Sequence, residues 1–125
     1  MGNLNEFIRL LSDQTRLRIL VLLAQSDLFV CELCGLLNLS QPKVSRHLAK
    51  MKDLGFVRMK REGKYILYSL SLSEGASKEM LDAIIRHMDD NPVLILDKSN
   101  LINHDDYVLG CNPRGSSKRI IEGLE

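Results

Sequence analysis

The sequence predicts a mainly helical α+β fold, in which three helices and a β-hairpin are flanked by one further helix at each end. Three observations support this. Apolar residues recur at helical spacing over residues 4–54, alternate with polar residues over 56–69, and return to a helical stripe over 76–88. The order helix–helix–helix–hairpin is typical of a winged helix-turn-helix. With 125 residues, 45% of them hydrophobic and 26% charged, we expect one main domain over 1–92 and a C-terminal extension over 93–125.

The first two helices are indicated by apolar spacing and by a polar cap between them. The first carries Leu4, Phe7, Ile8 and Leu11 at helical spacing. Ser12 or Asp13 can cap the second, because short polar side chains accept hydrogen bonds from the free amides at a helix start. The apolar face of the second helix consists of Leu17, Leu20, Leu23 and Ala24.

A short turn separates the third predicted helix from the fourth. The segment 30–37 forms a short apolar helix that ends near Asn38. Ser40 is a suitable N-cap for the next helix, and Pro42 lies in its first turn, where a missing N–H costs little. Gly55 follows the end of that helix. A turn of three residues between two helices is what a helix-turn-helix needs.

A hairpin and one more helix complete the main domain. Alternation over 56–69 surrounds a glycine suited to a hairpin turn. Ser71 or Ser73 opens the last helix, and Pro92 follows its end. The apolar stripe of this helix is Ala76, Met80, Leu81, Ile84, Ile85 and Met88. Beyond it the chain shows no sustained period, and 93–96 is either a strand or a buried turn.

The fourth helix has an apolar face and a basic face. Val44, Leu48 and Met51 fall on one side at 100° per residue, which predicts a buried stripe. The opposite side is cationic and polar, as suits a helix that enters the major groove of DNA. Further cations at the hairpin tip would contact phosphates or the minor groove. The candidate DNA-binding residues are Gln41, Lys43, Ser45, Arg46, His47, Lys50, Lys60, Arg61 and Lys64.

The charge distribution supports a nucleic-acid partner, although the whole chain carries only +1. Residues 41–65 hold eight basic and two acidic side chains, a charge of +6, which leaves −5 for the rest of the chain. Positive charge gathered on a helix and a hairpin is typical of a DNA contact. The alternatives are a solvated helix face or a basic surface for another acidic partner, and the salt dependence of binding would distinguish them.

Four segments match the pattern of one protein family. Residues 13–20 are similar to its second helix, 28–34 to its metal-binding segment, 40–48 (Ser-Gln-Pro-Lys-Val-Ser-Arg-His-Leu) to its recognition helix, and 63–70 to its wing. Together they resemble the arsenic-responsive repressor family (ArsR, or ArsR/SmtB). The resemblance implies a homodimeric, cytoplasmic repressor that binds an inverted-repeat DNA operator and leaves it when an effector binds. It also implies that the first and last helices pack across the two-fold axis, through Leu4, Phe7, Met80, Ile84 and Met88.

The three cysteines are the candidate sensing groups. Cys31 and Cys34 are three residues apart at the start of the third helix, so their sulfurs lie on one face. A helix N-terminus lowers the pKa of a thiol, and two convergent thiolates select soft ions. An odd cysteine count in a cytosolic setting argues against a structural disulfide. The alternative for this pair is two small buried hydrophobic residues.

In the family, this segment can carry three cysteines that bind trivalent arsenic or antimony. Cys31 and Cys34 match two of those positions, and Phe29 occupies the third. Either the two thiols act with an exogenous ligand, or Cys111 folds back as a third ligand, from its own chain or from a partner. The expected effector is therefore As(III) or Sb(III). Drawing the sulfurs onto one ion would distort the third helix and tilt the recognition helix.

Two other sensing chemistries stay open at this point. One is a thiol-redox switch, in which Cys31 or Cys34 oxidises and Cys111 resolves. The other is a cadmium- or zinc-type sensor, although His87 and Asp90 lack the spacing expected of a zinc site on the last helix. We expect no enzyme activity, because no nucleophile–base or phosphate-loop arrangement is present. We expect no membrane partner, because the apolar runs are too short to span a bilayer.

Overall fold

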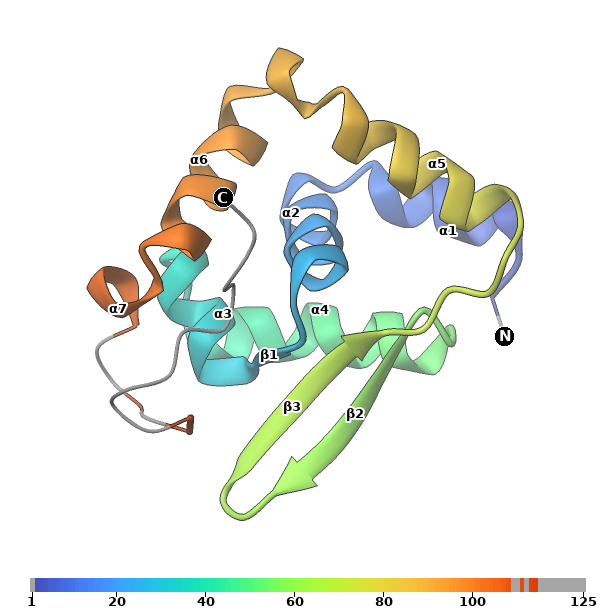
Figure 1. Ribbon diagram of the computed structural model, residues 1–125. Coiled ribbons are helices and arrows are strands. Elements are labelled where there is room, and N and C mark those ends of the chain that lie inside the picture. The colour runs from blue at the N-terminus through green and yellow to red at the C-terminus, as the bar shows by residue number, and fades with distance from the viewer. Residues whose placement is uncertain (1, 109–110, 112, 115–125) are drawn as a thin grey trace.

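The computed structural model describes residues 2–108, 111, 113 and 114 (Figure 1). Its elements in chain order are α1 (Leu4–Leu11), α2 (Gln14–Gln25), β1 (Leu28–Phe29), α3 (Val30–Leu37), α4 (Gln41–Asp53), β2 (Val57–Glu62), β3 (Tyr65–Leu70), α5 (Ala76–Arg86), the 3-10 helix η1 (Met88–Asp90), α6 (Pro92–Ile102) and α7 (His104–Tyr107). The predicted winged helix-turn-helix order is confirmed. None of the helices among the described residues combines the length and the apolar composition needed to cross a membrane.

Local capping explains where the first helices begin and end. Asn3 and Glu6 form a capping box at the start of α1, and the Asp13 side chain accepts from the Arg16 amide at the start of α2. Asn38 ends α3 in the left-handed conformation with a φ of 56°. Ser40 precedes α4 as predicted, but its side chain makes no capping hydrogen bond.

The sheet has three antiparallel strands in the order β1-β3-β2. The predicted hairpin pairs Val57 with Leu70 at its base and Glu62 with Tyr65 at its tip. Gly63 takes a φ of 63° in the turn, which favours a residue without a Cβ. The two-residue strand β1 pairs with β3 and was not predicted, because two residues are too few to show a period.

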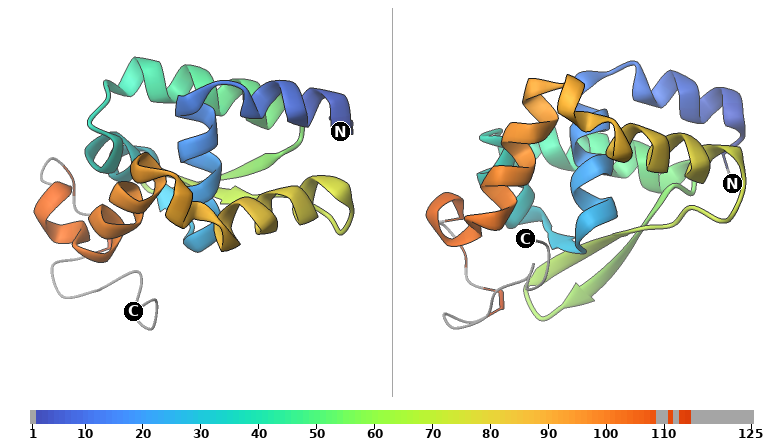
Figure 2. Two further views of the ribbon diagram at one scale, coloured as in Figure 1. Left: turned by 90° about the horizontal axis from the view of Figure 1, so that it is seen from above. Right: turned by 45° about the horizontal axis from the view of Figure 1, so that its top comes forward.

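Helix α2 lies at the centre of the molecule, and the hairpin extends away from the helical body (Figures 1 and 2). Five consecutive residues of α2, from 19 to 23, are buried because α1 packs on one side of this helix and α6 on another. Phe7 and Phe56 meet edge to face in the same core, with ring centroids 5.1 Å apart.

The segment 93–96, predicted as a strand or a buried turn, is helical, and this corrects the prediction. Asn91 caps α6 by accepting from two of its amides. The buried positions of α6 include Asp97 and Asn100 as well as Leu94 and Leu101, so polar residues interrupt the apolar period that would have indicated a helix. Leu94 and Leu101 belong to the same core cluster as α2.

A buried ion pair joins α6 to α2. The Arg18 guanidinium donates from Nε and Nη2 to the two carboxylate oxygens of Asp97, each at 2.9 Å. The Asp97 side chain is only 1% exposed, so this carboxylate depends on Arg18 for its charge compensation. Bidentate pairing also fixes the rotation of α6 about its axis.

Candidate nucleic-acid interface and cysteine site

Helix α4 has the two faces that its sequence predicts. Val44, Leu48 and Met51 are fully buried and hold the helix on the core. Lys43, Arg46, Lys50 and the amide of Gln41 lie on its exposed side. Pro42 lies in the first turn, and residues 40–43 are exposed, so DNA can approach the N-terminus of the helix.

Ser45 and His47 are half-buried and are less available than the cations around them. The Gln41 amide donates to the Ser45 hydroxyl at 3.0 Å, so this pair forms a local polar edge. Burial lowers the pKa of His47, and the nearby Asp13 carboxylate only partly opposes this. His47 therefore carries little charge at neutral pH, and its DNA-binding role stays a prediction.

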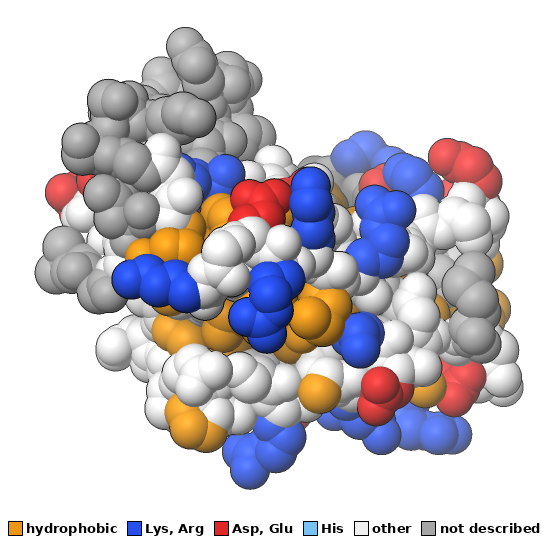
Figure 3. Space-filling model, turned by 90° about the horizontal axis from the view of Figure 1, so that it is seen from below, with side chains coloured by type: hydrophobic (Ala, Val, Ile, Leu, Met, Phe, Trp, Pro, Cys, Tyr) orange, Lys and Arg blue, Asp and Glu red, His pale blue; other side chains and the backbone are white. Residues whose placement is uncertain are grey.

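The hairpin presents its cations well away from the core. Lys60, Arg61 and Lys64 are exposed, and the Lys64 ammonium lies 5.4 Å from the centre of the Tyr65 ring. Lys60 has a loose contact with Glu62, with 3.6 Å between Nζ and the carboxylate. Figure 3 shows Lys and Arg side chains spread around a strip of hydrophobic side chains on one face of the molecule.

A groove with a volume of about 430 Å³ runs between the start of α3, the exposed edge of α4 and strand β3. Its lining contains both apolar and polar side chains, and it places Cys31 on the same surface as Gln41 and Ser45. The lining residues are Phe29, Val30, Cys31, Gln41, Ser45, Ala49, Lys64, Tyr65, Ile66 and Tyr68. Cys31 and two of the predicted DNA-contacting residues, Gln41 and Ser45, thus line the same groove.

The cysteines are arranged differently from the sequence-based expectation. Cys31 and Cys111 form a disulfide across 80 residues, with Cα atoms 6.3 Å apart. The expectation of no structural disulfide, which was based on the odd cysteine count, is therefore wrong, and the pairing is one that the redox alternative allowed. It failed because the return of the tail to α3 is a tertiary contact that no cysteine count can show. Cys34 remains a free, half-buried thiol, and burial raises its pKa. The expected helix-terminus effect is therefore outweighed by desolvation at this thiol.

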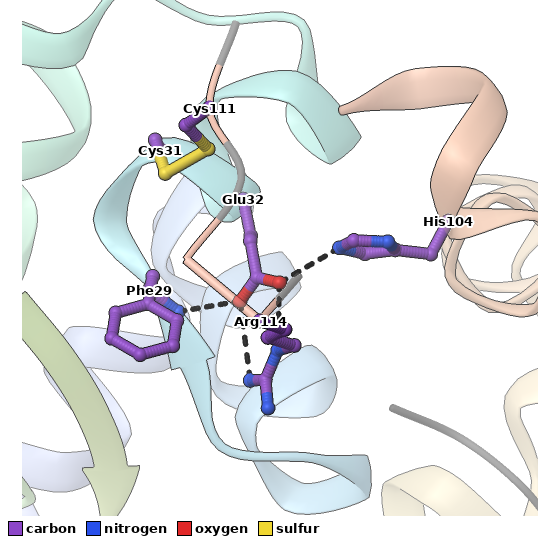
Figure 4. Close-up of a disulfide and its surroundings, with 6 residues drawn as sticks. All are labelled: Phe29, Cys31, Glu32, His104, Cys111 and Arg114. Atoms are coloured by element: carbon purple, nitrogen blue, oxygen red, sulfur yellow. Dashed lines mark hydrogen bonds and ion pairs between the residues drawn. A yellow bond between two sulfur atoms is a disulfide. The ribbon is translucent and has the colours of Figure 1, made fainter. Parts of the chain in front are cut away.

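Glu32 lies between the two cysteines of α3 and is completely buried. Its carboxylate accepts from the Phe29 amide, from His104 Nε2 and from Arg114 Nε, each at 2.8 Å (Figure 4). Burial raises the pKa of Glu32, but these hydrogen bonds outweigh it and leave the pKa below its usual range. A charged carboxylate is thus stable in this position only because the C-terminal residues cover it.

The contacts of Glu32 with His104 and Arg114 were not predicted from the sequence. One signal was available: an acidic residue in the middle of the apolar segment 28–37 needs a partner if that segment is buried. The partners are 72 and 82 residues away, so they could not be named from spacing.

The three candidate sulfur ligands do not form a ready-made ion site in this oxidised state. Cys31 and Cys111 are brought together but are joined to each other, and Cys34 lies apart as a thiol. Among residues 2–108, 111, 113 and 114, no three His, Cys, Asp or Glu side chains are grouped so that they could hold a metal ion. Thiols are nevertheless the ligand type that soft ions prefer, so the reduced chain carries a fitting donor set.

The expected interface residues fall into two groups. Leu4 is 41% exposed, and Met80 and Ile84 are half-buried, so these three have surface to offer a second copy. Phe7 and Met88 are buried within the chain itself, since they complete its own core. The homodimer stays a prediction.

Comparison with known proteins identifies the helix-turn-helix. The family model described as "Bacterial regulatory protein, arsR family" matches residues 13–59. The chain is 43% identical over 67 residues to the arsenical resistance operon repressor of Escherichia coli, covering 53% of this chain and 57% of that protein. The chain spans about half the length of the first curated relatives that it matches.

Two solved structures have a similar fold over about two thirds of this chain. Reduced HlyU from Vibrio cholerae has a TM-score of 0.59 at 34% identity, over 63% of this chain and 81% of that one. An AntR antimony-specific transcriptional repressor has a TM-score of 0.58 at 26% identity, over 67% and 75%. The matched portions carry the winged helix-turn-helix.

Proposed function

The chain belongs to the arsR family of bacterial regulatory proteins, and on this premise we propose that it is a metalloid-responsive transcriptional repressor. The observation that carries the proposal is the shared groove, in which a cysteine of α3 and two residues at the N-terminal end of α4 line one surface. A sensor residue and a DNA-reading helix in contact are what an effector-controlled repressor needs.

DNA contact is assigned to α4 and the hairpin. Gln41 can pair with adenine and Arg46 with guanine in the major groove, while Lys43 and Lys50 contact phosphates. The hairpin cations Lys60, Arg61 and Lys64 follow the backbone or the minor groove. Two copies related by a two-fold axis would read the two halves of an inverted repeat.

The effector is assigned to the cysteine thiols in their reduced form. The names of the E. coli relative and of the antimony-specific repressor favour trivalent arsenic or antimony. Three thiols and one arsenous acid give three As–S bonds and three waters. With two thiols, one hydroxyl stays on the arsenic. Contraction of the sulfurs onto one ion moves the first turn of α3, and the packing of α3 against α4 transmits that movement to the recognition helix.

The homodimer is assigned to α1 and α5. These helices contact each other, and α1 leaves Leu4 and Ile8 exposed at 41% and 47%. An exposed leucine and isoleucine on α1, a helix that packs beside α5, are suited to an intersubunit contact.

The test is DNA binding by reduced protein under titration with arsenite, antimonite, cadmium and zinc. The DNA is an inverted-repeat fragment obtained by in vitro selection, and binding is followed by fluorescence anisotropy. Release by arsenite or antimonite alone supports the proposal. The double variant Cys31→Ser and Cys34→Ser should stay bound. The variant Cys111→Ser shows whether release needs the Cys111 thiol in addition to those of Cys31 and Cys34. Normal release of the double variant by arsenite would contradict the proposal.

The disulfide favours a second candidate function, a thiol-redox-sensing repressor. In this case a peroxide takes two electrons from Cys31 and Cys111, the disulfide forms, and the peroxide leaves as an alcohol and water, or as two waters. Intact mass spectrometry of the released protein separates the two functions. A loss of two hydrogens identifies the redox switch, whereas an added arsenic mass identifies metalloid binding.

A further inference from the structure

Residues far along the chain contact α3 at three separate places. Cys111 is bonded to Cys31, the backbone of Tyr107 and Val108 lies so close to Gly35 that a Cβ there would clash, and Arg114 reaches Glu32. We call His104, Tyr107, Val108, Cys111 and Arg114 the C-terminal strap. Its three contacts are spaced along one side of α3, so the strap follows the helix rather than touching it once.

The polar contacts of the strap use different atoms from the disulfide. Arg114 donates from Nε to Glu32 at 2.8 Å and from Nη2 to the Asp27 carbonyl at 2.6 Å, and its guanidinium lies 5.2 Å from the centre of the Phe29 ring. His104 Nε2 adds a contact to Glu32 at 2.8 Å. Figure 4 shows the carboxylate pointing between His104 and Arg114, beside the disulfide. None of these contacts uses a sulfur atom.

The position of Glu32 makes these contacts strong. With the strap docked, its side chain is completely buried, and His104 and Arg114 of the strap supply two of its three hydrogen-bond partners. Charge-assisted hydrogen bonds to a buried group are stronger than neutral ones, and leaving such a group unpaired is costly. The carboxylate therefore favours the docked strap over a detached one.

We propose that Glu32 is a positioning residue that docks the strap on α3 and so keeps the Cys111 thiol beside Cys31 after the disulfide is reduced. Without docking, Cys111 would be held only by the nine residues that follow the end of α6 at Ile102, so the two thiols would meet at a lower effective concentration. With docking, Cys111 is available either to re-form the disulfide or to join Cys31 and Cys34 on one ion. The binding of one ion by all three cysteines rests on the proposed function, whereas the re-formation of the disulfide does not.

The first test measures docking without DNA or metalloid. Oxidised glutathione takes two electrons from the Cys31 and Cys111 thiols, which gives the protein disulfide and two reduced glutathiones. The equilibrium constant of this exchange is the effective concentration of the two thiols. We expect Glu32→Gln and Arg114→Gln each to lower it at least about tenfold, or about 30 mV for a two-electron couple.

Matched controls use the same substitutions at exposed positions. Glu62→Gln on the hairpin and Arg86→Gln at the end of α5 should leave the constant within about twofold of wild type. Arg114 is at the edge of the contact, so Arg114→Gln decides the question even if circular dichroism shows that Glu32→Gln does not fold. A constant unchanged in Arg114→Gln would overturn docking by Glu32.

The second test counts thiols on arsenite. Reduced wild-type protein should lose three titratable thiols per bound arsenite, whereas Cys111→Ser should lose two. Arg114→Gln should need at least about tenfold more arsenite to engage the third thiol. If the exchange constants change as expected but arsenite protects no thiol, docking stands and the metalloid function falls. If arsenite protects two thiols in wild type and in Arg114→Gln alike, the role of the strap in metalloid capture is refuted.

Discussion

The DNA-facing unit and the sensor helix are held in place by different kinds of contact. Helix α4 and the hairpin are positioned by apolar stripes and by the register of adjacent strands, so the burial of Val44 and the pairing of Val57 with Leu70 follow from short-range patterns. Helix α3 is held by the Cys31–Cys111 disulfide and by the buried carboxylate of Glu32. The partners of these two residues are 72 to 82 residues away along the chain. The comparison teaches that the DNA-facing unit depends mainly on local patterns. The position of the sensor helix α3 depends on pairs of residues far apart in the chain, and each such pair needs both of its members.

The largest expected effect concerns another pair of residues that are far apart in the sequence, Arg18 and Asp97. Asp97→Ala leaves Arg18 without its bidentate partner at the contact between α2 and α6, and should lower the free energy of unfolding by about 3–5 kcal/mol. Urea denaturation followed by circular dichroism measures it. The control is Asp82→Ala, which breaks an exposed pair with Lys78 and should cost under about 1 kcal/mol. Equal losses in both variants would remove the distinction between buried and surface pairs.

The intermediate effect is on the DNA-facing side. Arg46→Ala removes an exposed guanidinium from α4 without touching its buried stripe, so binding to the selected DNA should weaken by about 1–3 kcal/mol while the unfolding free energy stays within about 0.5 kcal/mol. Anisotropy at several salt concentrations measures it, with Arg86→Ala on α5 as the control. An affinity for DNA that is unchanged in Arg46→Ala would show that another face contacts the DNA.

The smallest effect tests the strap by pH. The hydrogen bond to Glu32 raises the pKa of His104 above its ordinary value of 6.5, burial opposes this, and Asp105 adds to the rise. The stabilisation is fully present below about pH 6.5 and is lost as pH rises through the raised value. The melting temperature of wild type should therefore fall over that window relative to His104→Gln. Parallel curves for the two proteins would show that His104 does not titrate against Glu32.

The DNA-facing unit could be predicted because its information is local. The stripe of Val44, Leu48 and Met51, the turn at Gly63 and the end of α3 at Asn38 are each decided by a few neighbouring residues, and the structure has all three. The helix α6 could not be predicted in the same way. Its buried face includes Asp97 and Asn100, and the burial of Asp97 is explained only by Arg18 on the partner helix α2.

The sequence by itself determined the family, the winged helix-turn-helix and the concentration of positive charge on one helix and one hairpin. Periodicity, capping and charge act over a few residues, so they can be recognised without the fold. Only the tertiary structure decided that Cys111 meets Cys31, that burial raises the pKa of Cys34, and that Glu32 is covered by His104 and Arg114. The physical reason is that these outcomes depend on burial and on long-range proximity, which are properties of the packed chain and not of any short segment.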